Sequence, residues 1–393
     1  MMHDSRVDRH AETLGADGHD VTVLCVRTLR TKREETKAHY SIVRRRDLLR
    51  RLIEARMYVR APPDSAVGRT AEVKNVSLPR YLIRRFFRFA LAVVFDVTMA
   101  LEAKRLNANL YVCNDLDTLP VGMFMSLLGR RVVYDAHELY PDLFSETQPY
   151  VRTLMRQIES YLIHFTDLVI TVNEFIASEM RSRYGIPAPT VVMNCPKSPP
   201  EISAVWSERK GKTILYHGGL TRERGLENIV LACKRLGKNV RVVFRGEGPI
   251  EESLKELAQG LQNCHFEKPV PVDEVISKAA EADVGIVAYL PTTLNNLYAS
   301  PNKLFEYLQA GLPVVGSSIP FVRQILVENE VGFVFDPYDP ADIARTIDLI
   351  TREETYVKMK RNVEKVRGLF SWQIESRKFL RSIYGVLSEE SSR

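Results

Sequence analysis

Short runs of β-branched and apolar residues alternate with helical stretches along most of this 393-residue chain. Strands that alternate in this way with helices form parallel sheets covered by helices on both faces. The predicted strands lie at 20–26, 109–113, 131–135, 167–172 and 190–194 in the first half, and at 212–217, 239–245, 263–267, 283–288, 313–316 and 332–335 in the second. The alternation therefore predicts an α/β protein.

The chain is longer than a single α/β core, so two domains are expected. A break falls at residues 194–200, where three closely spaced prolines make a stiff connector. We therefore predict one Rossmann-like domain at residues 1–195, a second at 196–370 and a final helical segment at 371–393.

The N-terminal end departs from this pattern. Residues 6–14 look helical and precede the first predicted strand, whereas a Rossmann-like domain starts with a strand. Either the first strand of this domain is absent from the sequence, or another segment takes its place.

Charge and cysteine usage narrow the class of protein. The 55 basic and 49 acidic residues leave a net charge of +6, which is too mild an excess to favour a nucleic-acid partner. The five cysteines are far apart and include no Cys-x-x-Cys pair. Their spacing favours reduced thiols in a cytoplasmic protein.

An apolar segment at residues 86–101 follows Arg80, Arg84 and Arg85. It is shorter than the roughly 20 residues that span a bilayer. A basic, aromatic helix over residues 80–95 could instead make a peripheral contact with the inner face of the plasma membrane. An ordinary packed helix with a solvated basic edge is the alternative.

The strongest candidate site begins where a predicted strand ends in Gly218 and Gly219. Glycines at a strand-to-helix turn let backbone N–H groups approach a phosphate, and the helix start favours negative charge. Arg222 and Arg224 lie in the same turn and could bind a diphosphate. A second glycine turn, at Gly246, follows the next strand and is predicted to form another wall of the same pocket. Tight turns without a ligand are the alternative.

A helix of about three turns is predicted after Ser300, which would be its N-cap, with Pro301 at the first helical position and Gly311 beyond its end. Lys303 in the first turn opposes the helix dipole, and a bound anion would remove that conflict. Glu306 shares the face of Lys303 and could accept two sugar hydroxyls. An exposed salt bridge between Lys303 and Glu306 is the alternative.

Polar residues also follow the strands of the first half, and sites in open α/β sheets gather at the carboxyl ends of strands. His137 could hydrogen-bond the transferring sugar or an acceptor hydroxyl, unless it is a structural histidine of the loop. Asp115 or Asp117 could orient an acceptor hydroxyl. Two carboxylates in one loop, without a third ligand, do not predict a metal site.

Together these segments resemble the family 4 retaining glycosyltransferases of the GT-B fold over nearly the whole chain. The likeness rests on the Gly218-Gly219-Leu220 turn that ends in Arg224-Gly225, on Glu306 followed by Gly311, Pro313 and Val314, on Asp283 within Ala-Asp-Val, and on Asp135-Ala136-His137-Glu138. It implies two Rossmann-like domains that face each other across a cleft. Residues 1–195 would bind the acceptor, 196–370 the nucleotide sugar, and the helix at 371–393 would cross back to the first domain.

The resemblance also implies a role for each motif. Glu306 would hold the ribose hydroxyls, and Arg224 and Lys303 would neutralise the departing diphosphate with no metal ion or other cofactor. The catalytic residues would be His137, near the donor sugar, and Asp115. The other donor-binding residues would be Gly218, Gly219, Gly246, Val270, Tyr298, Ser300 and Asn302. The anomeric configuration of the donor would be retained.

Three features depart from the family pattern. The family's first strand and its glycine-containing loop should precede residues 4–7, so the resemblance leads us to expect that this strand is absent and that the reading frame begins upstream of Met1. Such a strand is central in the family's sheet, and its loss would expose backbone N–H and C=O groups. The arginine of the family's first turn is Gly219 here, and Lys303 could compensate for the lost phosphate contact. The first glutamate of the family's pair falls at Tyr298, which removes a carboxylate expected near the sugar ring.

We therefore expect a cytoplasmic hexosyltransferase that uses a UDP- or GDP-linked sugar. Its acceptor would be a glycan or a lipid-linked sugar in cell-envelope or exopolysaccharide synthesis. One alternative is a catalytically degenerate protein that only binds nucleotide sugar, which Tyr298 would favour. The other is a nucleotide-sugar epimerase of the same fold, which would need paired acid and base groups around the sugar ring.

Overall fold

The computed structural model describes residues 4–27, 31–46, 93–143, 149–198 and 211–388. These form two compact units. The first comprises Met1–Tyr134, Leu162–Leu168 and Gly385–Arg393, and the second comprises Asp135–Tyr161 and Val169–Tyr384. The domain boundary that we place after residue 195 stays a prediction.

The predicted membrane-surface helix at 80–95 lies outside the described residues, apart from its last three positions. Within the described ranges, no helix combines the length and the apolar character needed to cross a bilayer.

The first unit opens with α1 (Ser5–Ala16), whose N-cap Asp4 accepts hydrogen bonds from the N–H groups of the next helical turn. A small sheet with the order β1-β3-β2 follows. β1 (Thr22–Arg27) runs parallel to β3 (Ser41–Arg46), and β2 (Glu34–Thr36) is antiparallel to β3. The predicted helix at 6–14 and the strand at 20–26 are confirmed.

The strands β2 and β3 were not predicted, because charged side chains hide the strand pattern of β3. Arg44 pairs with Glu35 of β2 at 2.7 Å, and Arg45 pairs with Glu102. The charges of Arg44 and Arg45 are therefore matched by acidic residues from other segments of the chain. Sequence periodicity alone does not reveal such pairs.

A second sheet has the order β4-β5-β6-β7. Its strands are β4 (Leu110–Asn114), β5 (Arg131–Ala136), β6 (Leu168–Thr171) and β7 (Thr190–Val191), close to the predicted positions. The intervening helices are η1 (Leu116–Thr118), α4 (Leu119–Leu127), η2 (Tyr140–Leu143), α5 (Pro149–Leu162), η3 (Ile163–Phe165) and α6 (Glu174–Tyr184). Asn173 caps α6, and Gly185 ends it in the left-handed conformation with φ of 65°.

A six-stranded sheet with the order β10-β9-β8-β11-β12-β13 forms the core of the second unit, and all its pairs are parallel. The strands are β8 (Lys212–His217), β9 (Val240–Arg245), β10 (Cys264–Glu267), β11 (Val284–Val287), β12 (Val314–Ser317) and β13 (Gly332–Phe335). All six predicted strands are confirmed, because strands buried on both faces read as continuous apolar runs.

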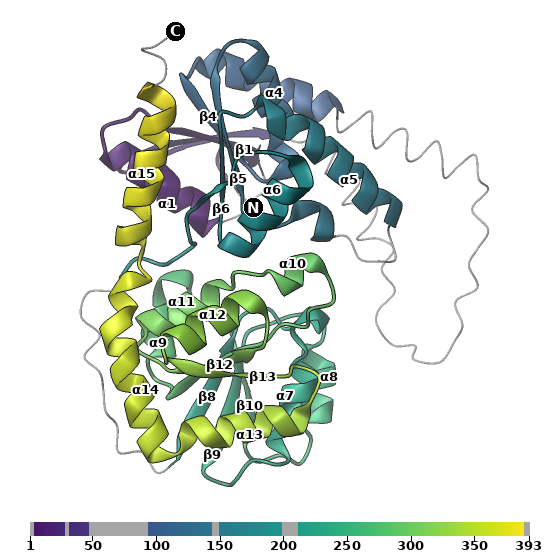
Figure 1. The fold of residues 1–393 in the computed structure, drawn as a ribbon, viewed down its shortest axis with the longest axis vertical. Helices are drawn as coiled ribbons and strands as arrows, with labels where there is room; N and C mark the ends of the chain where they lie inside the picture. Colours follow the sequence, from purple (N-terminus) through teal and green to yellow (C-terminus); the bar gives the residue numbers. More distant parts are fainter. Residues whose placement is uncertain (1–3, 28–30, 47–92, 144–148, 199–210, 389–393) are drawn as a thin grey trace, which may run out of the picture. The chain divides into compact units, whose positions relative to one another are not determined.

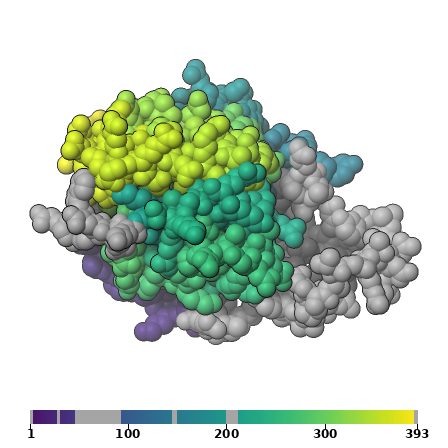
Figure 2. Space-filling view, turned by 90° about the horizontal axis from the view of Figure 1, so that it is seen from below, coloured from purple at the N-terminus to yellow at the C-terminus, as the bar shows by residue number. Residues whose placement is uncertain are grey.

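Helices cover both faces of this sheet (Figure 1). One face carries α7 (Leu226–Cys233), α8 (Glu251–Leu257) and α13 (Pro340–Thr351), and the other carries α9 (Val275–Ala279), α11 (Asn302–Gln309) and α12 (Pro320–Glu328). Helices α14 (Glu353–Val366) and α15 (Trp372–Ser388) follow, and α15 confirms the predicted final helix. Figure 2 shows the yellow segment of α13 and α14 against the teal-to-green part of the chain, where α13 packs on α7.

Parallel strands end at the same edge of a sheet, so the loops that follow them meet there. In the six-stranded sheet these are the turns after β8 and β9 and the long loop after β11. That loop also holds α10 (Leu294–Leu297), and η4 (Arg222–Arg224) lies in the turn after β8. Two shorter turns elsewhere in the unit are η5 (Val272–Glu274) and η6 (Arg367–Leu369).

Candidate functional site

The two glycine turns of the predicted site are in direct contact. A side chain at Gly246 would place its Cβ 1.9 Å from the carbonyl oxygen of Gly218, so only glycine fits there. Gly218 has a φ of 121°, which also favours glycine. The N–H groups of Gly218 and Leu220 donate to the carbonyls of Arg245 and Glu247, both at 3.0 Å. These two amides therefore hold the turns together and do not face a ligand, contrary to our expectation for Gly218.

Helix α11 begins one residue later than predicted. Pro301 occupies the N-cap position, Asn302 is the first helical residue, and Ser300 does not cap the helix. At eight residues the helix makes just over two turns, not three. The predicted end is confirmed, since Gly311 follows it with a φ of 73°. Ser300 Oγ is buried and makes no hydrogen bond to any described residue.

Lys303 lies in the first turn of α11 and is only 9% exposed. Its ammonium nitrogen lies 3.4 Å from the position that a Cβ on Gly218 would occupy, so it reaches the first glycine turn. Burial, and secondarily the positive charge of Arg224, hold the pKa of Lys303 well below its usual range, while Glu306 partly opposes the shift. An anion bound here would supply the counter-charge that the ammonium lacks.

Glu306 does not form the alternative salt bridge with Lys303. Its Oε2 lies 2.7 Å from Nε2 of His217, the last residue of β8. The N–H of His217 in turn donates to the hydroxyl of Tyr307 at 2.9 Å, and the two rings pack with centroids 4.5 Å apart. The Glu306 carboxylate is therefore fixed at the end of β8 while remaining partly exposed.

Arg224 ends the short η4 turn and lies over the ring of Tyr289, with its guanidinium carbon 3.7 Å from the ring centroid. Its Nη1 is buried and has no hydrogen-bond partner among the residues that the structure describes. A buried guanidinium donor without a partner is costly, so this group is suited to bind an anion.

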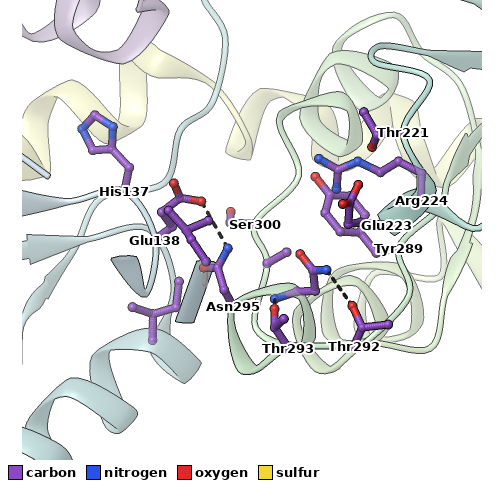
Figure 3. A pocket seen from close by; sticks show the side chains of 14 residues that line it. His137, Glu138, Thr221, Glu223, Arg224, Tyr289, Thr292, Thr293, Asn295 and Ser300 are labelled. Atoms are coloured by element: carbon purple, nitrogen blue, oxygen red, sulfur yellow. Dashed lines mark hydrogen bonds between the residues drawn. The ribbon is translucent and has the colours of Figure 1, made fainter. Parts of the chain in front are cut away.

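A pocket of about 700 Å³ lies within the second unit next to Arg224 (Figure 3). It is lined by His137, Glu138, Leu143, Ile176, Thr221, Glu223, Arg224, Tyr289, Thr292, Thr293, Asn295, Asn296, Ala299 and Ser300. Of the predicted site residues, His137, Arg224 and Ser300 line it. A pocket of this size is typical of small-molecule sites, and eleven of its fourteen lining residues carry polar side-chain groups, which suits a polar ligand.

One wall of this pocket is fixed by a pair of hydrogen bonds from Asn295. Its Oδ1 accepts the N–H of Leu139 at 3.0 Å, and its Nδ2 donates to Glu138 Oε2 at 3.2 Å. Next to them, His137 Nε2 lies 3.1 Å from Oδ2 of the fully buried Asp135. These contacts join the loop after β5 to α10 and point Glu138 and Asn295 into the pocket, as Figure 3 shows.

The other predicted residues lie elsewhere. Asp115 directly follows β4 in the first unit and His137 lies in the second, so a shared catalytic role for the two stays a prediction. It has the left-handed φ of 59° that non-glycine residues rarely adopt, and its carbonyl accepts from both the N–H and the hydroxyl of Thr118. Val270 lies half-buried after β10 and is not among the pocket-lining residues.

Two further donor-binding predictions concern the ends of the α10–α11 loop. Tyr298 stacks on Phe175, with centroids 6.0 Å apart, and its carbonyl accepts from Asn173. Asn302 is exposed, and its Oδ1 accepts from Asn194 at 2.8 Å. Both side chains have structural partners in the second unit. Gly219 is exposed on the first glycine turn.

Sequence reasoning missed Tyr289, Glu138 and Asn295 as site residues. Tyr289 and Asn295 follow β11, whose carboxyl end opens at the same edge as the two glycine turns. Their position after a strand of this sheet is the sequence signal that could have identified them as site residues. Within the described part of the chain, no group of three His, Cys, Asp or Glu side chains is arranged to hold a metal ion.

This combination of α/β sheets with glycine turns and cations at a strand edge defines an α/β protein of the GT-B class. Two family models match the chain: residues 5–196 match Glycosyltransferase Family 4, and residues 200–366 match Glycosyl transferases group 1. The chain belongs to glycosyltransferase family 4, as the sequence motifs predict.

Known proteins support this assignment. The chain is 25% identical to a protein from Pseudomonas aeruginosa named as a probable glycosyltransferase, WbjE, over 70% of this chain and 73% of that protein. It is also 25% identical to TuaH from Bacillus subtilis, a glycosyltransferase whose name refers to teichuronic acid biosynthesis, over 66% of this chain and 63% of that one.

Solved structures confirm the predicted GT-B fold. Sucrose-phosphate synthase from Thermosynechococcus elongatus superposes with a TM-score of 0.71 at 15% identity, over 98% of this chain and 93% of that one. Anabaena Alr3699/HepE, solved with UDP-glucose, gives 0.59 at 17% identity, over 75% and 82%.

Proposed function

We propose that this glycosyltransferase moves a sugar from a nucleoside diphosphate carrier to a glycan or lipid-linked acceptor. The observation that carries the proposal is the pairing of Arg224 and Lys303 beside the Gly218 turn. Arg224 has a buried donor that finds no partner in the described ranges of the chain, and Lys303 has a buried ammonium with a lowered pKa. A diphosphate would satisfy both groups. The crystal structure of Anabaena Alr3699/HepE in complex with UDP-glucose supports a nucleotide-sugar donor for this fold.

The chemistry follows from these charges. In the transfer, the bond between the anomeric carbon and the diphosphate oxygen breaks and a new bond forms to the acceptor oxygen. The acceptor proton passes to the departing diphosphate. Arg224 and Lys303 stabilise the negative charge that develops on that group, which lowers the barrier to transfer. Glu306 accepts hydrogen bonds from the two ribose hydroxyls and so holds the nucleoside diphosphate in position.

The sugar would extend into the pocket of about 700 Å³ toward His137, Glu138 and Asn295. We propose that the configuration of the anomeric carbon is retained, and that the reaction needs no metal ion because the two cations supply the positive charge. Cell-envelope or exopolysaccharide synthesis in the cytoplasm is the proposed setting, in keeping with the name of TuaH.

A thermal-shift screen of the wild-type protein with UDP, GDP and their sugars tests the donor. A ligand at about 100 times its dissociation constant stabilises the folded state by about 2.7 kcal/mol, which is a readily measured shift. The nucleotide sugars that raise the melting temperature are then incubated with glycan and membrane-lipid extracts. NMR of the product reports the anomeric configuration.

Each alternative has its own outcome in this design. Binding without product from any acceptor would favour the degenerate binding protein. Conversion of one nucleotide sugar into another without an acceptor would favour the epimerase. If no nucleoside diphosphate shifts the melting temperature, the proposed donor site is wrong.

A further inference from the structure

Two positive charges meet at the proposed diphosphate site, and acidic side chains do little to offset them. Within the part of the chain that the structure describes, neither Arg224 nor Lys303 forms an ion pair, and the Glu306 carboxylate is hydrogen-bonded to His217. The repulsion between the two cations contributes to the lowered pKa of Lys303. Something other than a carboxylate must therefore hold these cations in place.

The ring of Tyr289 contacts both cations. The Arg224 guanidinium carbon lies 3.7 Å from its centroid and the Lys303 ammonium lies 5.8 Å from it. Tyr216 supplies a second face to Lys303 at 4.1 Å. All three distances are within the range in which the negative face of an aromatic ring attracts a cation. Figure 3 shows the Arg224 side chain beside the Tyr289 ring at the pocket wall.

The backbone of Tyr289 is held from two sides. Its N–H donates to Oγ of the fully buried Ser317 at 2.9 Å, which ties it to β12. The N–H of the next residue, Leu290, donates to the carbonyl of Glu223 at 2.9 Å, which ties the same loop to the η4 turn. A side chain at Gly225 would come within 2.7 Å of Leu290, so the two segments pack closely. The ring is therefore fixed relative to Arg224.

We propose that Tyr289 is a positioning residue of the diphosphate site, whose ring face holds Arg224 and Lys303 together and leaves their N–H donors available to the ligand. The inference rests on the proposed function and adds a specific device to it. A carboxylate in this place would neutralise the cations and compete with the diphosphate. An aromatic face attracts them without a formal charge and without accepting their in-plane hydrogen bonds. The hydroxyl of Tyr289 has no part in this role.

The test compares Tyr289→Leu with Tyr289→Phe by isothermal titration calorimetry. The probes are UDP, UMP and uridine, or the guanosine series if the wild-type protein binds GDP instead. We expect Tyr289→Leu to weaken UDP binding about tenfold or more, because it removes two cation–π contacts, and to change uridine binding less than about twofold. Tyr289→Phe keeps the ring and should stay within about threefold of wild type. Tyr338→Leu, at an exposed tyrosine, is the matched control and should change neither.

The outcomes separate this role from a purely structural one. A structural defect would weaken uridine and UDP alike, and equal losses for both would overturn the proposal. If Tyr289→Phe loses as much affinity for UDP as Tyr289→Leu, the proposal is also overturned, because the loss would then come from the hydroxyl and not from the ring. If Tyr289→Leu does not fold, Tyr289→Met fills a similar volume without a ring and is held to the same expectation. A wild-type protein that binds no nucleoside diphosphate contradicts the proposed function first, and is recognised before any variant is made.

Discussion

At the scale of single residues, Lys303 shows why this site favours an anion. A buried ammonium next to a guanidinium loses hydration and gains repulsion, and both effects lower its pKa from the usual 10.5. Between the lowered pKa and 10.5 the unfolded chain binds more protons than the folded one, so the cost in stability is largest below the lowered pKa and is relieved as pH rises. A bound diphosphate should reverse the shift.

We therefore predict that binding of a nucleoside diphosphate becomes weaker as pH rises above the lowered pKa of Lys303 toward 10.5, and that binding in this range takes up a proton at Lys303. Calorimetry in buffers of different ionisation enthalpy measures that uptake. Lys303→Arg keeps its charge at every accessible pH, so its proton uptake should be absent and its pH dependence shallow. Equal proton uptake in the two proteins would assign the titration to another group.

Glu306 offers a second test at this scale. An ionised carboxylate accepts two hydroxyl donors, whereas an amide offers a single acceptor oxygen, so Glu306→Gln should bind UDP about tenfold more weakly. The loss should vanish for 2′,3′-dideoxy-UDP, which lacks both hydroxyls. Calorimetry with both ligands measures the difference, with the exposed Glu328→Gln as control. If the dideoxy ligand loses as much affinity as UDP, Glu306 does not contact the ribose.

At the scale of elements, the site depends on how two strand ends meet. The turns after β8 and β9 touch through Gly218 and Gly246 and are joined by three backbone hydrogen bonds. Backbone atoms, unlike the far end of a flexible side chain, cannot move aside without shifting the strands to which they belong.

Gly246→Ala should therefore lower the free energy of unfolding by about 1–3 kcal/mol, because its Cβ would lie 1.9 Å from the Gly218 carbonyl oxygen. The displaced Gly218 turn should also weaken nucleotide binding. Urea unfolding and calorimetry measure the two effects. Gly237→Ala is the matched control, since a Cβ there meets nothing within 4 Å, and its change should stay within about 0.5 kcal/mol. Equal stability of the two variants would show that the turns separate easily.

The elements themselves were predictable from sequence to different degrees. The strands of the six-stranded sheet are buried on both faces, so their apolar runs showed them within one or two residues. β3 was missed because Arg44 and Arg45 are matched by acidic residues from other segments of the chain. Arg224 and Lys303 were found through local turn and cap patterns. Tyr289 was not, because its contacts with them join segments that are far apart in the chain and leave no periodic signal. Ser300 was misassigned as a cap because Pro301 takes the N-cap position.

At the scale of the whole molecule, the family and the fold are established, and sugar transfer is tested on the intact chain. Nucleotide binding tests only the six-stranded half, where Arg224, Lys303 and Glu306 lie. Turnover tests both halves, including Asp115 at the end of β4, whose backbone conformation is unusual for a non-glycine residue. Strained backbone of this kind is common at functional sites and costs about 1–3 kcal/mol, so it is a reason to test Asp115 and does not by itself assign it a role.

The final prediction concerns how the whole molecule neutralises the leaving group. A departing nucleoside diphosphate carries at least two negative charges, which enzymes meet either with a divalent metal ion or with fixed cations. Here Arg224 and Lys303 supply two positive charges at the glycine turn. We therefore predict that sugar transfer by the wild-type protein is unchanged, within about twofold, by excess EDTA or by added magnesium or manganese, whereas Arg224→Met lowers kcat/KM by about 100-fold or more. Product formation from a radiolabelled nucleotide sugar measures both. EDTA removes metal ions, whereas the substitution removes the charge of Arg224. If transfer stops with EDTA and recovers with manganese, Arg224 and Lys303 are not sufficient to neutralise the leaving group.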